Sequence, residues 1–264
     1  MNTLWWIGGA ALAGGVVSTL AAAFTLRLAP TWIPRLVSFA VGALLGAVFL
    51  ELLPHALESG SVDYVMAIVL VGLLAFFFLE KLVLWRHAHG HAHHAQDAEE
   101  SEHDHALHVD TNIEQGRPGL MILIGNGVHN FCDGVVIAAA FLADHALGIA
   151  TTLAIFAHAV PQQVGDFAVL LHSGFSRQRA FAFNVGAGFA TLAGAFTAYV
   201  ALEGTQHVLP TVLAIAASSL LYVAVADLIP SLHRRPEPVE TARQALLIGL
   251  GLGTIAIAHV ALEH

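Results

Sequence analysis

The sequence predicts an all-α, polytopic membrane protein that forms one transmembrane domain over residues 1–264. Three observations predict this class. Of the 264 residues, 57% are hydrophobic and 11% are charged, whereas about a quarter of the residues of a soluble domain are charged. The mean hydropathy is +0.73. A water-soluble fold of this size cannot bury so much apolar surface, so a lipid bilayer is the expected partner.

The third observation is a series of eight stretches, each with about 20 mostly apolar residues, which is the length that spans a bilayer as a helix. The first stretch has no positive charge before Arg27, so we expect a retained span there rather than a cleaved signal peptide. The predicted spans cover residues 4–27, 33–54, 63–85, 119–143, 146–171, 180–202, 208–230 and 244–262.

The basic residues all lie in or next to alternate connections between the predicted spans. Positive charge accumulates on the cytoplasmic side, so an even number of spans predicts that both termini are extracytoplasmic. The net charge of −9 argues against nucleic acid as a partner. The ten residues are Arg27, Arg35, Lys81, Arg86, Arg117, Arg177, Arg179, Arg234, Arg235 and Arg243.

The long connection over residues 86–117 is rich in histidine and is predicted to be a cytoplasmic loop too polar to pack. Neutral imidazoles are good ligands for zinc-type ions, so the loop could capture metal. A solvated linker with dispensable histidines explains the same composition. The candidate capture residues are His89, His91, His93 and His94.

Two consecutive spans carry polar pairs at helical spacing. His129 and Asp133 are four residues apart in the fourth span, and so are His158 and Gln162 in the fifth. A helix bends at a proline, so Pro161 is expected to bend the fifth span. A histidine inside a membrane is often a packing residue, but two such pairs favour a metal site.

Two imidazoles and one carboxylate suit zinc or a similar ion better than Ca²⁺ or Mg²⁺. The sequence therefore predicts one site in which His129, Asp133, His158 and Gln162 are the ligands. Four neighbours are predicted to support it: Asn126, Asn130, Gln163 and Asp166.

One short pattern occurs in two spans that cross in opposite directions. The second span contains Glu51-Leu52-Leu53-Pro54, and the seventh contains Asp227-Leu228-Ile229-Pro230. Opposed copies are typical of an inverted repeat, here spans 1–3 and 6–8 around spans 4 and 5. Glu51, His55 and Asp227 are predicted to line the ion pathway; helix capping or interhelical hydrogen bonding is the alternative role.

These motifs resemble the Zrt- and Irt-like (ZIP) family of divalent-metal transporters, in particular its LIV-1-like branch. His129-Asn130-Phe131-Cys132-Asp133-Gly134 is similar to the family's HNxxDG pattern, and residues 158–167 are similar to HExPxE followed by GDF. The resemblance implies eight helices, uptake of zinc (or Fe²⁺, Mn²⁺ or Cd²⁺) into the cytoplasm, a metal site between spans 4 and 5, and a possible homodimer.

The sequence departs from the family pattern at two acids. Ala159 and Gln163 stand where the family commonly has glutamates that help to hold a second metal ion. We therefore expect a single tight position, an ion that is cargo rather than a cofactor, and no enzymatic activity. A metal sensor and a metal-dependent intramembrane hydrolase are the alternatives. The expected location is a bacterial inner membrane.

Overall fold

The computed structural model describes residues 3–25, 32–96, 111–233 and 237–262, and this part of the chain is helical with no strand. Its α-helices are α1 (Thr3–Thr25), α2 (Ile33–Gly46), α3 (Leu53–Ser59), α4 (Val62–Gln96), α5 (Thr111–Ala143), α6 (His145–His172), α7 (Arg177–Leu202), α8 (Leu209–Tyr222), α9 (Ile229–Leu232) and α10 (Pro238–Leu262). Two π-helical segments, η2 (Ala47–Leu52) and η4 (Val223–Leu228), and one 3₁₀ turn, η3 (Gln206–Val208), complete the chain order.

Six helical segments of the described chain are long and apolar enough to cross a membrane. They are Ile33–Ser59, Val62–Leu79, Gly125–Ala143, Arg177–Leu202, Leu209–Leu232 and Pro238–Leu262. Helices suit this setting because each backbone polar group is satisfied within the segment. The structure thus supports a polytopic membrane protein, while the crossing of α1 and α6, which would raise the number to eight, stays a prediction.

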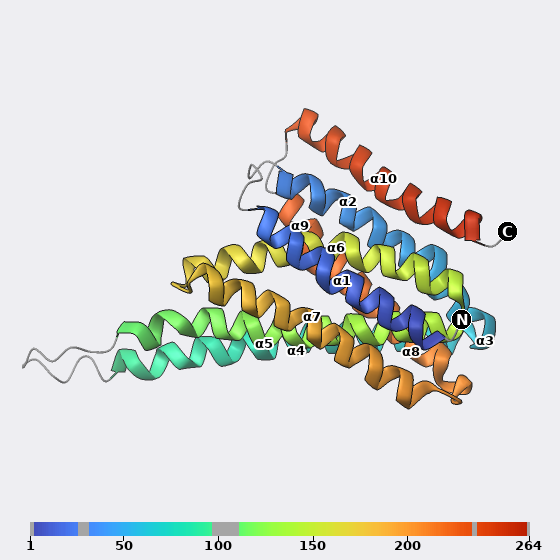
Figure 1. The fold of residues 1–264 in the computed structure, drawn as a ribbon, viewed down its shortest axis with the longest axis horizontal. Helices are drawn as coiled ribbons and strands as arrows, with labels where there is room; N and C mark the ends of the chain where they lie inside the picture. The colour runs from blue at the N-terminus through green and yellow to red at the C-terminus, as the bar shows by residue number, and fades with distance from the viewer. Residues whose placement is uncertain (1–2, 26–31, 97–110, 234–236, 263–264) are drawn as a thin grey trace, which may run out of the picture.

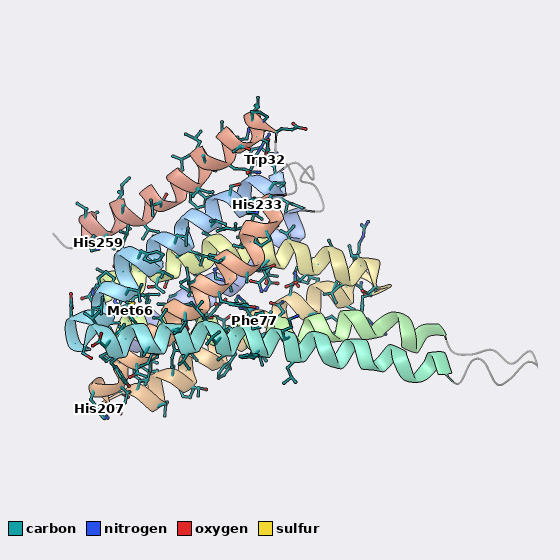
Figure 2. The ribbon with its side chains drawn as sticks, turned by 180° about the vertical axis from the view of Figure 1, so that it is seen from behind. Trp32, Met66, Phe77, His207, His233 and His259 are labelled. Atoms are coloured by element: carbon teal, nitrogen blue, oxygen red, sulfur yellow. The ribbon has the colours of Figure 1, made fainter. Side chains whose placement is uncertain are left out.

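The helices run alternately along the long axis of the molecule, as Figure 1 shows. The start of α1 and the end of α10 lie at the same end. His207 and His259 lie at this end too, whereas Trp32 and His233 lie at the opposite end (Figure 2). Helices α2, α7 and α10, which carry Arg35, Arg177 and Arg243 near their N-terminal ends, all start at the opposite end (Figure 1). This arrangement agrees with the predicted one-sided distribution of basic charge.

The helices pack in two groups. The first group consists of α1, α5, α6 and α7, which contact one another. The second consists of two pairs, α2 with α10 and α4 with α8. The groups meet where α2 and η2 lie against α6. The pairing of α1 with α7 was not predicted, and the inverted-repeat relation stays a prediction.

Glycines allow the closest helix crossings. A Cβ at Gly134 of α5 would overlap the backbone oxygen of Thr191 in α7, and a Cβ at Gly194 of α7 would overlap that of Phe131. The crossing of α2 and α10 is built in the same way around Gly42. Small residues let helix backbones approach in a membrane, and here they hold α5 against α7 beside Asp133.

The two copies of the acid-Leu-aliphatic-Pro pattern share a backbone distortion. At the end of η2 the N–H of Leu53 donates to the oxygen of Val48, and at the end of η4 the N–H of Ile229 donates to that of Ala224. Both bonds span five residues because the following prolines cannot donate and crowd the preceding turn. Glu51 and Asp227 occupy the same position in their segments. The sequence match therefore extends to the local backbone.

The predicted loop over residues 86–117 is shorter than expected. Helix α4 continues to Gln96 and α5 begins at Thr111, so His89, His91, His93 and His94 lie on the helical backbone of α4. The Ala- and His-rich sequence contains no proline, and alanine is a strong helix former, so the helix extends past the apolar span. The side chains of these histidines and residues 97–110 lie outside the described part of the structure.

Candidate metal centre

Helices α5 and α6 form an antiparallel pair whose connection is Asp144. Its Oδ1 accepts hydrogen bonds from the backbone nitrogens of Ala146 (2.7 Å) and Leu147 (3.1 Å), which caps the first turn of α6. The cap fixes the point at which the chain reverses. It thereby brings the polar face of α5 that carries His129 and Asp133 opposite His158 of α6.

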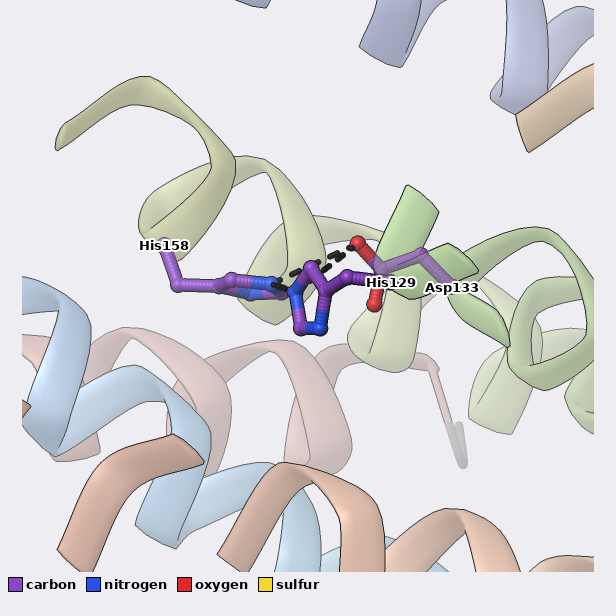
Figure 3. Close-up of side chains that lie close together, drawn as sticks. All are labelled: His129, Asp133 and His158. Carbon is purple, nitrogen blue, oxygen red and sulfur yellow. Dashed lines mark hydrogen bonds and ion pairs between the residues drawn. The ribbon is translucent and has the colours of Figure 1, made fainter. Parts of the chain in front are cut away.

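Three side chains converge between these helices, as Figure 3 shows. The Nε2 atoms of His129 and His158 are 3.2 Å apart, and each lies 3.5 Å from Oδ2 of Asp133. Ligand atoms about 2.0–2.1 Å from a tetrahedral zinc ion are about 3.4 Å from one another. The three atoms are therefore spaced as they would be around one ion.

The surroundings of His129, Asp133 and His158, called the triad below, favour metal binding. His158 and Asp133 are only 1% and 3% exposed, whereas the side chain of His129 is 20% exposed. Nδ1 of His158 lies 3.3 Å from the oxygen of Ala154, and this contact requires the nitrogen to donate. The lone pair of Nε2 then faces the triad, as in histidines that bind metals.

Gln162, the fourth predicted ligand, lies beside the triad. Its side chain interacts with that of His129, and its Nε2 donates to Oδ1 of Asn126 at 3.3 Å. The same oxygen accepts a bond of 2.5 Å from Nδ2 of Asn130. Because the amide nitrogen of Gln162 is used in this way, its carbonyl oxygen is the atom that remains for an ion. The metal-binding role of all four residues stays a prediction.

The supporting residues form a network around the triad. Oδ1 of Asn130 accepts a bond of 3.4 Å from the hydroxyl of Thr191, which links α5 to α7. The backbone oxygen of Gln163 accepts one of 3.4 Å from Asn184. Sequence reasoning did not assign Thr191 or Asn184 to this network. Within the described residues, Oε1 of Gln163 and Oδ2 of Asp166 are buried without a hydrogen-bond partner.

The predicted pathway residues occupy different places. Asp227 is exposed on η4. Glu51 is buried on η2, where its carboxylate pairs with His259 of α10. Nδ1 of His55 bonds the backbone oxygen of Glu51 at 2.9 Å, so this ring nitrogen is used within its own helix. His259 was not predicted, although a carboxylate inside a membrane calls for a partner.

Asn126 gives a direct test of the network. We expect Asn126→Ala to weaken zinc binding about 10-fold, because Gln162 and Asn130 lose their common acceptor. Loss of a hydrogen-bond partner behind a metal ligand lowers metal affinity about 10–100-fold. The number of ions bound at saturation should not change. Asn126→Asp, which keeps an acceptor oxygen, is the control. Isothermal titration with zinc measures both values, and equal affinity for wild type and Asn126→Ala would show that the network does not position the ligands.

Apolar membrane helices around a buried carboxylate and two imidazoles, one buried and one partly exposed, define a polytopic membrane protein with a candidate transition-metal centre. The sequence profile of the ZIP zinc transporters matches residues 3–259. The chain therefore belongs to the ZIP zinc transporter family. The similar ZIP13, ZIP4 and ZIP10 proteins place it with the LIV-1-like branch.

The similar proteins named here are vertebrate zinc transporters. Zinc transporter ZIP13 of Pongo abelii is 31% identical over 233 residues, which are 83% of this chain and 64% of that protein. ZIP13 of Mus musculus is 29% identical over 95% of this chain and 74% of its own length. Zinc transporter ZIP4 of Homo sapiens is 38% identical over 45% of this chain and 18% of its own. A bacterial inner membrane has no support from these proteins and stays a prediction.

Proposed function

We propose that this chain moves zinc, or a similar divalent ion, across the membrane into the cytoplasm through one metal position between α5 and α6. The observation that carries the proposal is the convergence of His129, Asp133 and His158 at the spacing of zinc ligands. Names of the family members support transport rather than sensing or hydrolysis. The partly exposed His129 gives an ion access to the otherwise buried triad.

The charges favour one ion rather than two. A divalent ion bound to the triad meets one carboxylate, that of Asp133, and keeps a net charge of about +1. Ala159 is buried and apolar, and Gln163 is neutral. A second divalent ion beside the first would be repelled with little negative charge to balance it. Asp166 lies about two turns beyond His158 on α6, and Asp227 lies on η4; we expect these carboxylates to receive the ion as it leaves the triad.

The proposed cycle moves the ion from the end of the molecule that holds His207 and His259 to the end that holds His233. The first end carries acidic groups, among them Glu58 and Asp63, which attract cations. After the ion binds the triad, the group of α1, α5, α6 and α7 shifts against the group of α2, α4, α8 and α10. A common transporter architecture exposes a midplane site in turn to each side in this way.

Flux through the purified protein tests this function. The full chain is reconstituted in liposomes that contain a zinc-sensitive dye, and zinc is added outside. We expect dye fluorescence to rise faster than in protein-free liposomes. Zinc binding in detergent without flux would contradict transport and favour the sensor; turnover of lipid or peptide by the zinc-loaded protein would favour the hydrolase.

A further inference from the structure

A groove lies between α1 and α7, which Figure 1 shows side by side. Its volume is about 210 Å³, and all but one of the residues that line it are apolar. Gly15 of α1 and Gly188 of α7 lie where the two backbones meet. Val16 is 55% exposed and Phe189 is 66% exposed. The groove is therefore apolar and open on the side that faces the bilayer.

The size of the groove suits a hydrocarbon chain rather than a helix. A helix with its side chains is about 10–12 Å across and does not enter a space of this volume. An apolar cavity of about 150 Å³ holds a benzene ring, so the groove holds a run of methylene groups. Gly15 and Gly188 have no side chains to fill it. In a bilayer, the apolar chain that reaches such a groove is the acyl chain of a lipid.

A basic residue lies along α7 from the groove. The 26-residue segment Arg177–Leu202 is a candidate membrane span, and its length of about 39 Å exceeds the hydrocarbon core of about 30 Å, so Arg177 reaches the headgroup layer. It precedes Val185, which lines the groove, by a little over two helical turns, with the exposed Phe181 between them. Arg179 lies on another side of the helix. A guanidinium group matches the geometry of a phosphate.

The distance from Arg177 to the groove matches the length of a lipid. Val185 and Leu192 line the groove on α7, and they lie about 12 and 22 Å along the helix from Arg177. Half of a bilayer, headgroups included, is about 20–22 Å thick. A lipid whose phosphate contacts Arg177 therefore places the end of its acyl chain in the groove. Basic groups between membrane helices bind anionic headgroups in this way.

We propose that the groove between α1 and α7 binds one anionic phospholipid, with its phosphate on Arg177 and an acyl chain in the groove. Val185 and Leu192 directly follow Asn184 and Thr191, whose side chains belong to the network around the triad. The bound chain therefore packs against the helix that supports this network and stabilises its contact with α1. The proposal concerns lipid binding and does not depend on transport.

Lipid binding to the purified protein tests the proposal. The full chain is stripped of lipid in detergent and mixed with phosphatidylglycerol or phosphatidylcholine that carry the same acyl chains. We expect native mass spectrometry to show one bound phosphatidylglycerol per chain, held about 5-fold more tightly than phosphatidylcholine because of one arginine. Saturating phosphatidylglycerol should also raise the Tm by about 5 °C.

Two pairs of variants separate the headgroup from the acyl chain. Arg177→Gln should bind the two lipids equally, whereas Arg179→Gln, on another side of α7, should keep the preference. Val16→Phe puts a ring into the groove and should lose about 10-fold in affinity for both lipids. Val17→Phe adds the same ring at an exposed neighbour that does not line the groove, and it should bind as wild type does.

Equal binding of phosphatidylglycerol by Val16→Phe and Val17→Phe would overturn the proposal, and so would an unchanged headgroup preference in Arg177→Gln. If wild type binds no lipid but is a dimer that Val16→Phe dissociates, the groove is an interface between copies of this chain and the proposal is wrong. Should Val16→Phe fail to fold, the comparison of Arg177→Gln with Arg179→Gln decides.

Discussion

Asp133→Asn and His158→Ala should each abolish tight zinc binding and reduce zinc uptake to the background of empty liposomes. Asp133 supplies the negative charge of the triad, and His158 supplies a buried imidazole that a water molecule cannot replace in the same orientation. Removing one partner from a buried charged group costs about 3–5 kcal/mol. We therefore expect affinity to fall by at least about 100-fold, measured by isothermal titration.

A matched control is needed because both substitutions lie in the core of the protein. His207→Ala removes an exposed histidine of η3 at one end of the molecule (Figure 2), and it should retain wild-type binding and uptake. Asp133→Asn preserves the shape of the side chain and should elute as wild type does in size-exclusion chromatography. Undiminished uptake in both triad variants would refute the assignment of the site.

The second large effect concerns the crossing of α5 and α7. Gly134→Ala places a Cβ against the backbone oxygen of Thr191, and neither helix can yield without moving apart. Overpacking of this kind costs about 1–3 kcal/mol, so we expect the Tm in detergent to fall by about 5 °C. Because Gly134 follows Asp133, zinc affinity should fall as well.

Gly127→Ala is the control for this prediction. Gly127 lies on the same helix, and a Cβ at this position has no neighbour within 4 Å. Alanine is the better helix former by about 1 kcal/mol, so the Tm should stay the same or rise. Equal Tm values for the two variants would show that α5 and α7 do not approach as closely as the structure places them.

The positions of the membrane helices were largely predictable, because an apolar run of fixed length is a property of the local sequence. The predicted span 180–202 corresponds to Arg177–Leu202, and 208–230 corresponds to Leu209–Leu232. The second span continues to Ser59 rather than ending near residue 54. This extension has no long apolar run to reveal it, since the last turns contain Pro54 and Glu58.

The helix neighbours were not predictable, because glycine and alanine mark close approach without naming the partner. Nothing in the sequence of α5 indicates that Gly134 meets Thr191 of α7. The π-helical segments were missed for a related reason: a proline predicts a distortion but not its form. The partner of Glu51 did leave a signal, since His259 is an isolated polar residue in an apolar helix near the same end of the molecule.

The candidate centre was predictable because its residues follow helical spacing. His129 and Asp133 share one face of α5, and the matching face of α6 carries His158 and Gln162, so two adjacent antiparallel helices must bring them near one another. The role of Asn130 was not predictable in detail. Its side chain forms hydrogen bonds with Asn126 and Thr191. Whether the side chain of Asn130 bonds a neighbouring helix or a metal depends on how α7 packs against α5, which the sequence does not reveal.

Zinc-edge anomalous diffraction from crystals of the full chain, loaded with one equivalent of zinc, would locate the bound ion relative to α5 and α6. We predict one strong anomalous peak within bonding distance of Nε2 of His129, Nε2 of His158 and the Asp133 carboxylate. A principal peak away from these three atoms, or two peaks of equal height between α5 and α6, would contradict this prediction.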